Sequence, residues 1–200
     1  MSGGFSEAER ERIRERLVAE GRELFARYGL KKTTIGELTE PVGIANGTFY
    51  QFFDSKTDLY VEILEREGEE MLPRLIAPLE EEDDPETAIV EFLTALMDEI
   101  ETNPLVRRLL VEPDEMEMLR DYHTEEELAR DREESLGYML PYVEAWYEAG
   151  EVTGPSPRLV ASAIRSVSFL TLHQEDIGED LYGETRDLVI RSVAAGLTAD

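Results

Sequence analysis

The chain has 200 residues, of which 46 are Asp or Glu and only 20 are Lys or Arg, so its formal net charge is −26. It has no cysteine, which excludes disulfide bonds and thiolate metal sites. Its two histidines, His123 and His173, have no metal-ligand spacing around them, and we expect neither a metal nor a cofactor. No apolar run approaches the roughly 18 residues of a membrane-spanning helix, and the charged start does not resemble a signal peptide. We therefore expect a soluble cytoplasmic protein with no membrane partner.

The acidic charge is unevenly distributed. Residues 1–66 carry ten basic and twelve acidic side chains, a net of −2, whereas residues 67–200 carry ten and thirty-four, a net of −24. Salt must screen self-repulsion of this size, so the composition favours a halophilic source. Disorder also accompanies high charge, but a hydrophobic content of 42% in helical periods argues against it. The N-terminal end lacks this acidic excess, which is consistent with a nucleic-acid contact there.

The first predicted motif helix starts at Thr34. Thr34 and Glu37 have the spacing of a capping box, in which the two side chains satisfy amides at a helix start. An apolar face follows at helical spacing, and Gly43 supplies the left-handed conformation that ends a helix. The members of this face are Ile35, Leu38 and Val42.

A second helix is predicted over residues 45–53, with Phe49 and Phe53 facing inward as an i,i+4 pair. The remaining positions are left to face outward: Asn46, Gly47, Thr48, Tyr50, Gln51 and Phe52. Ser55 and Asp58 then cap a third helix and place Lys56 at its N-terminus, where amides and positive charge attract a phosphate. This order of elements predicts a helix-turn-helix.

Residues 10–62 resemble the TetR family of transcriptional regulators. The resemblance rests on Leu24, Phe25, Tyr28, Gly29, Gly43, Gly47, Thr48, Phe49, Tyr50, Phe53 and Lys56. It implies that Thr34, Tyr50 and Lys56 hold phosphates. It also implies that the major groove is contacted by Asn46, Gly47, Thr48, Gln51 and Phe52.

Departures from the family pattern limit this inference. Pro41 replaces a common Ala and should shorten or bend the first motif helix, because proline has no amide hydrogen. Asn46 stands where Lys is frequent, and Gly36 where some relatives place a base-reading side chain. Asn46 and Gln51 could equally be solvated surface, whereas Thr34 is a helix cap in either reading.

The rest of the chain predicts further helices and no strand. Their expected ranges are 55–72, where Pro73 bends or ends the helix, then 84–102, 104–110, 124–149 with a disturbance near Pro141, 156–173 and 180–197, while 112–121 is irregular or partly helical. The fold class is therefore all-α. A three-helix helix-turn-helix domain over 1–54 precedes a helical ligand-binding and dimerisation domain over 55–200.

The last two predicted helices carry apolar stripes that would form a homodimer interface. These stripes contain Leu159, Ala163, Val167 and Leu170, then Leu181, Leu188, Val189, Val193 and Leu197. They could instead cover the core of one monomer. The resemblance implies pairing through two C-terminal helices, and a two-fold dimer predicts a roughly palindromic double-stranded operator.

Aromatic and thioether side chains between these regions suit a small, mainly apolar effector. The candidates are Phe92, Leu96, Met97, Met116, Tyr122, Tyr138, Tyr142, Trp146, Phe169 and His173. The resemblance implies that such a ligand releases DNA. A ligand-released homodimeric repressor is thus the predicted function.

Two other functions were weighed against it. An enzyme is disfavoured because the acidic runs spread around helices or fall in loops, with no nucleophile motif. A helical protein–protein interaction module that has lost DNA binding stays open, because basic residues are few.

Overall fold

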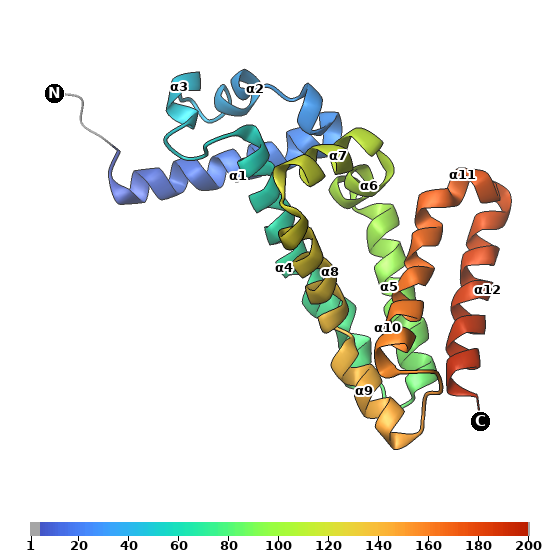
Figure 1. Ribbon diagram of the computed structural model, residues 1–200. Coiled ribbons are helices and arrows are strands. Elements are labelled where there is room, and N and C mark those ends of the chain that lie inside the picture. Colours follow the sequence, from blue (N-terminus) through green and yellow to red (C-terminus); the bar gives the residue numbers. More distant parts are fainter. Residues whose placement is uncertain (1–4, 200) are drawn as a thin grey trace. The chain divides into compact units, whose positions relative to one another are not determined.

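The computed structural model describes residues 5–199, and every regular element in that range is helical (Figure 1). The predicted all-α class is confirmed. The elements are α1 (Glu7–Lys32), α2 (Ile35–Thr39), α3 (Asn46–Phe49), α4 (Lys56–Glu81), α5 (Pro85–Thr102), α6 (Pro104–Val111), α7 (Pro113–Tyr122), α8 (Glu125–Gly137), α9 (Leu140–Ala149), α10 (Pro157–Ser166), the 3-10 helix η1 (Val167–His173), α11 (Gln174–Ile177) and α12 (Glu179–Thr198). Within residues 5–199, no helix is both long and apolar enough to cross a membrane.

The chain forms two compact units. The N-terminal unit comprises residues 5–69 and 103–122, and the C-terminal unit comprises residues 70–102 and 123–199. This division differs from the expected boundary at residues 54 and 55. The first turns of α4 belong with the helix-turn-helix because Leu59 and Ile63 are buried in its core, and α6 and α7 join through Leu105 and Leu119.

The core of the N-terminal unit draws on all of its helices. Leu17 and Phe25 of α1 are fully buried, and the ring of Phe25 meets Tyr60 of α4 edge-on at a centroid separation of 5.0 Å. Phe49 and Phe53 are buried together, with centroids 5.8 Å apart, as their spacing predicted. Burying such rings stabilises the unit by roughly 1.5–3 kcal/mol each.

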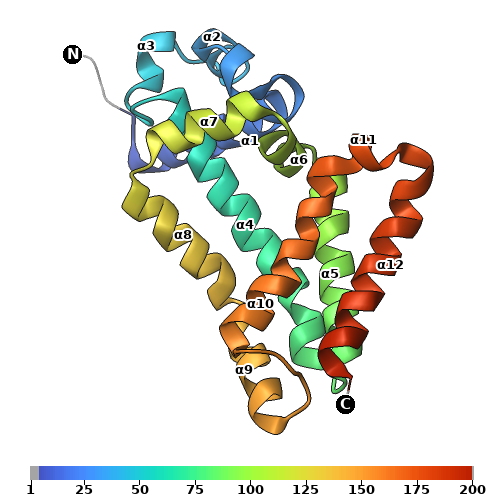
Figure 2. The same ribbon diagram turned by 45° about the vertical axis from the view of Figure 1, so that its right-hand side comes forward.

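The C-terminal unit is built on α5 and α12, which run antiparallel side by side, with α10 and η1 against them (Figures 1 and 2). Its core contains Ile89 and Leu93 of α5, Ile164 of α10 and Ile190 of α12, all with almost no exposed surface. α9 closes the same core through the buried Val143.

Several predicted boundaries were wrong. Pro73 does not end its helix, because α4 continues through it and through Pro78 to Glu81. Leu75 and Leu79 beyond it are buried, and this packing outweighs the backbone hydrogen bond that a proline removes. Residues 113–122 are helical.

The segment 124–149 is two helices, and Pro141 lies in the first turn of the second, where no amide hydrogen is needed. The helix expected over 156–173 tightens to a 3-10 helix at Val167. The short helix α11 had not been predicted.

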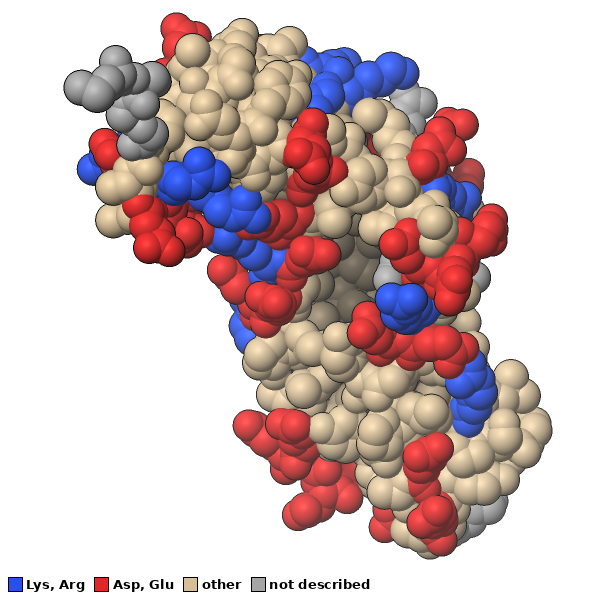
Figure 3. All heavy atoms as spheres, turned by 60° about the vertical axis from the view of Figure 1, so that its left-hand side comes forward, with Lys and Arg blue, Asp and Glu red and all other residues tan. Residues whose placement is uncertain are grey.

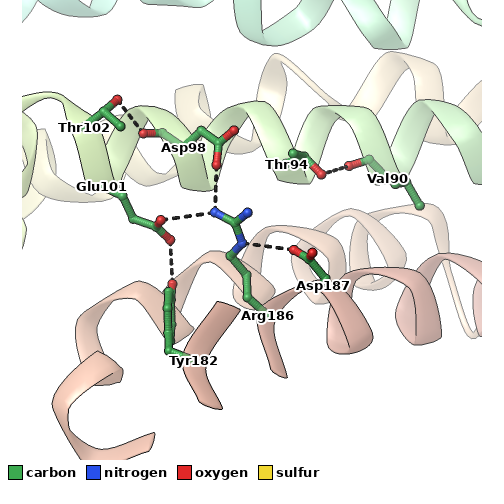
Figure 4. Close-up of polar contacts among 8 residues, drawn as sticks. All are labelled: Val90, Thr94, Asp98, Glu101, Thr102, Tyr182, Arg186 and Asp187. Atoms are coloured by element: carbon green, nitrogen blue, oxygen red, sulfur yellow. Dashed lines mark hydrogen bonds and ion pairs between the residues drawn. The ribbon is translucent and has the colours of Figure 1, made fainter. Parts of the chain in front are cut away.

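A cluster of charged side chains joins α5 to α12 (Figure 4). The Arg186 guanidinium donates to Asp98 at 2.7 Å, to Glu101 at 3.1 Å and to Asp187 at 3.2 Å. The Tyr182 hydroxyl donates to the other Glu101 oxygen at 2.6 Å. One largely buried cation therefore holds together carboxylates from both helices.

Replacing Arg186 with Met is expected to destabilise the protein by about 2 kcal/mol in low salt. The change leaves Asp98 and Glu101 repelling one another, and the partly buried Glu101 loses its cation. Chemical denaturation measures the loss, and molar KCl should reduce it because Asp98 is half exposed. Arg191→Met is the matched control, since Arg191 is exposed on the same helix. Equal effects of the two substitutions would contradict the role given to the cluster.

Candidate nucleic-acid interface

The start of α2 is capped as its sequence predicted. The Glu37 amide donates to the Thr34 hydroxyl at 3.3 Å, while the Thr34 amide donates to the Glu37 carboxylate at 2.8 Å. The Thr34 hydroxyl also donates to that carboxylate at 2.7 Å. These hydrogen bonds favour the ionised form, so Thr34 lowers the pKa of Glu37 below its usual value. Thr34 is exposed at this N-terminus.

This capping box predicts a dependence of stability on pH. Because the folded pKa of Glu37 is depressed, its contribution is present above the unfolded pKa of about 4.5 and is lost as the pH falls through the folded pKa. Glu37→Gln should therefore lower the thermal midpoint at pH 7, and the deficit should shrink towards pH 3. Glu40→Gln, on the same exposed stretch, is the control. A deficit that does not change with pH would contradict the capping role.

The turn after α2 follows the predicted chemistry. α2 ends at Thr39, two residues before Pro41, so the expected shortening is confirmed. Gly43 has a φ of +79°, and its amide donates to the Thr39 carbonyl at 3.0 Å. Ile44 then leads the chain into α3.

The helix α3 is shorter than expected, covering Asn46–Phe49 and continuing as turns through residues 50–52. Asn46, Gly47 and Gln51 are exposed, Tyr50 is 58% exposed, and Thr48 is half-buried. A Cβ added to Gly47 would meet no atom within 4 Å, so this point of the surface is open. The side-chain amide oxygen of Asn46 accepts a hydrogen bond from the Thr39 hydroxyl at 2.7 Å. This bond orients the side-chain amide of Asn46.

The expectation that Phe52 faces outward was wrong. Its ring is half-buried against Phe5 at a centroid distance of 6.1 Å, and the Arg10 guanidinium lies 5.0 Å from its centroid. Phe5, in the segment before α1, is an apolar partner far away in the sequence that the motif spacing did not reveal.

Lys56 has a structural role that its motif position did not predict. Its ammonium donates to the carbonyls of Leu30, Lys31 and Thr33, at 3.3 Å for Lys31 and 2.7 Å for Thr33. Burial lowers the pKa of Lys56, although the charges of Glu115 and Glu37 oppose this effect. Its three hydrogens therefore close the end of α1, and a phosphate contact would have to compete with these carbonyls.

Two exposed cations beside α2 were not among the predicted site residues. Lys31 and Lys32 end α1, directly before the α2 cap. The Lys-Lys pair in the sequence was the signal that could have identified them. Figure 3 shows Lys and Arg side chains gathered at two places on the N-terminal unit, with uncharged surface between them.

The predicted ligand residues are divided between the two units. Met116 and Tyr122 belong to the N-terminal unit, where the Tyr122 hydroxyl donates to Asp58. The other eight belong to the C-terminal unit, and they differ in burial. Phe92 and Met97 are core, Leu96, Tyr142 and Trp146 pack against that core, and Tyr138, Phe169 and His173 are exposed.

The predicted dimer residues also divide. Val167 is buried in the core of its own unit, and Leu170, Val189, Val193 and Leu197 pack against that core, as the monomer-core alternative anticipated. Leu159 and Ala163 are exposed. We define the α10–α12 face as the exposed residues Leu159, Ser162, Ala163, Ser166, Phe169, Leu181 and Leu188. Phe169 had been assigned to the ligand site.

The comparisons with known proteins agree with this geometry. Residues 17–63 match the model for "Bacterial regulatory proteins, tetR family". The match covers the helix-turn-helix segment of the N-terminal unit. Over 87 residues it is 26% identical to the nucleoid occlusion factor SlmA of Haemophilus influenzae, an alignment that covers 44% of this chain. The chain thus matches only about two fifths (40%) of that relative's length.

Solved structures share the whole fold. A TetR-family transcriptional regulator from Pectobacterium atrosepticum has a TM-score of 0.75 at 20% identity, covering 98% of this chain and 99% of its own. A TetR regulator from Haloarcula marismortui has a TM-score of 0.72 at 16% identity, with coverages of 94% and 98%. The transcriptional regulator FadR from Bacillus subtilis, in complex with stearoyl-CoA, has a TM-score of 0.70 at 14% identity, covering 92% of this chain and 98% of its own. These neighbours are transcriptional regulators and not enzymes.

Proposed function

We propose that this protein is a sequence-specific DNA-binding transcriptional regulator, acting as a homodimeric repressor that a small ligand releases. The observation that carries the proposal is the exposed surface of α3 and the turn after it, beside the capped N-terminus of α2. Polar groups without bulky apolar cover point outward there, as base recognition requires.

The predicted contacts other than Phe52 and Lys56 each have a role in this proposal. Asn46 and Gln51 carry amides that can pair bidentately with adenine, while Gly47 lets the backbone approach the groove and Thr48 lines it. The Tyr50 hydroxyl and Thr34, at the N-terminus of α2, would hold phosphates. Lys31 and Lys32 add positive charge next to Thr34.

A second copy of the chain is the proposed occupant of the α10–α12 face. Leu188 is 60% exposed and Leu181 56%, in a unit whose other exposed positions are rich in acidic residues. The small residues Ser162, Ala163 and Ser166 allow close helix approach. A two-fold dimer would present two α3 helices to a palindromic operator.

The effector is proposed to be small and mainly apolar. Two proteins with this fold are known with ligands that have an apolar part, FadR with stearoyl-CoA, which has an acyl chain, and RolR with resorcinol, which has an aromatic ring. For release, the effector must bind the DNA-incompetent state more tightly. A preference of about 3 kcal/mol would weaken DNA binding by roughly two orders of magnitude.

High salt in the cytoplasm of a halophile is the proposed working environment. The net charge of −26 requires screening, which molar salt provides. Base contacts and apolar packing would then carry more of the DNA affinity, because counterions compete for phosphates.

The alternative is an interaction module that no longer binds DNA. It is favoured by the engagement of basic side chains of the N-terminal unit with its own carbonyls and carboxylates. Arg10, Arg14, Arg16, Arg22, Lys56, Arg66 and Arg108 are all engaged in this way.

Substitutions on α3 and after it test the proposal. Gln51→Ala should weaken binding to a selected operator by about 1–3 kcal/mol and relax preference at one base pair. Tyr50→Phe should weaken binding to all sequences alike. Gln174→Ala, on α11 of the C-terminal unit, is the control. Wild-type affinity in both variants would overturn the contacts assigned to Gln51 and Tyr50, whereas a wild type that binds no duplex would favour the interaction module.

A further inference from the structure

The helix α3 does not hold itself in place. It has four residues, and no glycine in a left-handed conformation ends it, because the next positive φ in the chain beyond Gly43 is at Gly150. Its last carbonyls are met by amides of the following turn, since the Gln51 amide donates to the Thr48 carbonyl at 3.0 Å and the Phe52 amide donates to the Phe49 carbonyl at 2.9 Å. A helix this short is not stable by itself, so the orientation of residues 46–52 depends on contacts from other elements.

Two arginines of α1 bind carbonyls of the turn that follows α3. Arg10 Nη2 donates to the Gln51 carbonyl at 2.8 Å, and Arg14 Nη1 donates to the Phe52 carbonyl at 3.0 Å. The same guanidinium groups lie over rings of the segment, Arg10 at 5.0 Å from the Phe52 centroid and Arg14 at 4.5 Å from that of Phe53. Each arginine thus holds the chain by a hydrogen bond and by a cation–π contact.

A third arginine holds the other side of α3. Arg16 Nη1 donates to the Val42 carbonyl at 3.0 Å, and its Nη2 donates to the Pro41 carbonyl. These carbonyls lie in the turn that joins α2 to α3. The turns before and after α3 are therefore both fastened to α1, and Glu62 of α4 in turn fixes Arg14 by an ion pair.

We propose that Arg10, Arg14 and Arg16 form an arginine brace that sets the orientation of α3 for reading DNA, without contacting DNA phosphates. The inference rests on the proposed function. They are positioning residues, because their donors are directed to backbone carbonyls of the motif. Lysine cannot replace them, since a compact ammonium lacks the planar fork that stacks on a ring while bonding a carbonyl.

The brace and a phosphate contact predict different salt dependences. A side chain that neutralises a phosphate releases counterions, and its loss changes the slope of log affinity against log salt by about 0.9. An arginine bound to a protein carbonyl releases none from DNA. Loss of the brace should thus lower the affinity and leave the slope unchanged.

The experiment compares Arg14→Gln and Arg10→Gln, which remove the positive charge, with Arg12→Gln, each measured on a selected operator across a series of KCl concentrations. Arg12 is exposed on the same helix and has no hydrogen bond or ion pair among the contacts of residues 5–199, which makes it the matched control. We expect at least a tenfold loss of affinity for Arg14→Gln and Arg10→Gln, with wild-type slopes and wild-type affinity for Arg12→Gln. Circular dichroism at the binding temperature establishes that each variant is folded. Amide chemical shifts of residues 46–52 should move in the two brace variants.

The outcomes separate the two proposals. If the wild type binds an operator and the glutamine variants of Arg10 and Arg14 bind equally well, or if their slopes fall by about one, the brace is overturned while the proposed function stands. If the wild type enriches no duplex, the proposed function fails, and the role of the brace in reading DNA fails with it. Unchanged amide shifts would overturn the brace in either case.

Discussion

Replacing Gly29 with Ala is expected to destabilise the N-terminal unit by about 3 kcal/mol. Gly29 has φ 80° and ψ 168°, a region that is essentially confined to glycine and costs other residues on the order of 1–3 kcal/mol. A Cβ there would also lie 2.1 Å from the Glu115 carboxylate. That carboxylate is buried and accepts from the Leu30 amide at 2.9 Å, so it cannot move aside without losing a hydrogen bond worth roughly 1–3 kcal/mol.

The matched control is Gly43→Ala. Gly43 has a φ of +79°, nearly that of Gly29, but a Cβ there would meet no atom within 4 Å. It should therefore cost only the backbone strain, about 1 kcal/mol. Urea unfolding of both variants measures the difference. Equal losses would show that the approach of Glu115 to the end of α1 contributes nothing, contrary to this account.

Replacing Leu188 with Glu is expected to abolish the dimer and weaken operator binding by at least a hundredfold. The side chain is 60% exposed in one chain, so the substitution should change the stability of the isolated chain by no more than about 0.5 kcal/mol. In the dimer, by contrast, it would bury two unpaired carboxylates. A hundredfold shift in the dissociation constant corresponds to about 2.7 kcal/mol.

Sedimentation equilibrium measures the effect, with Tyr138→Glu as control. Tyr138, like Leu188, is an exposed large apolar residue of the C-terminal unit, but it lies outside the α10–α12 face. A dimer that survives Leu188→Glu and dissociates with Tyr138→Glu would place the interface elsewhere.

The local motif could be predicted from sequence because its signals are short-range. The Thr34 and Glu37 capping box, the left-handed Gly43 and the inward pair Phe49 and Phe53 each depend on residues within four positions of one another. Local propensity and local structure agree there. The helical class followed from the same kind of pattern.

What the sequence did not reveal depends on long-range contacts. The role of Lys56 at the end of α1 and the packing of Phe52 on Phe5 involve residues 23 to 47 positions apart. Pro73 was expected to end a helix because burial of Leu75 and Leu79 cannot be read from a local pattern. The apolar pattern of α10 and α12 did not distinguish residues that pack in the core from residues that are exposed, because apolar residues of both groups recur at helical spacing.

The central claim is that this chain reads a specific duplex sequence. Selection of bound sequences from random duplex DNA, in molar KCl with the purified protein, tests it most directly. The account predicts enrichment of a roughly palindromic site, with half-sites about one helical turn apart. A folded, dimeric protein that enriches no sequence would contradict it and favour the interaction module.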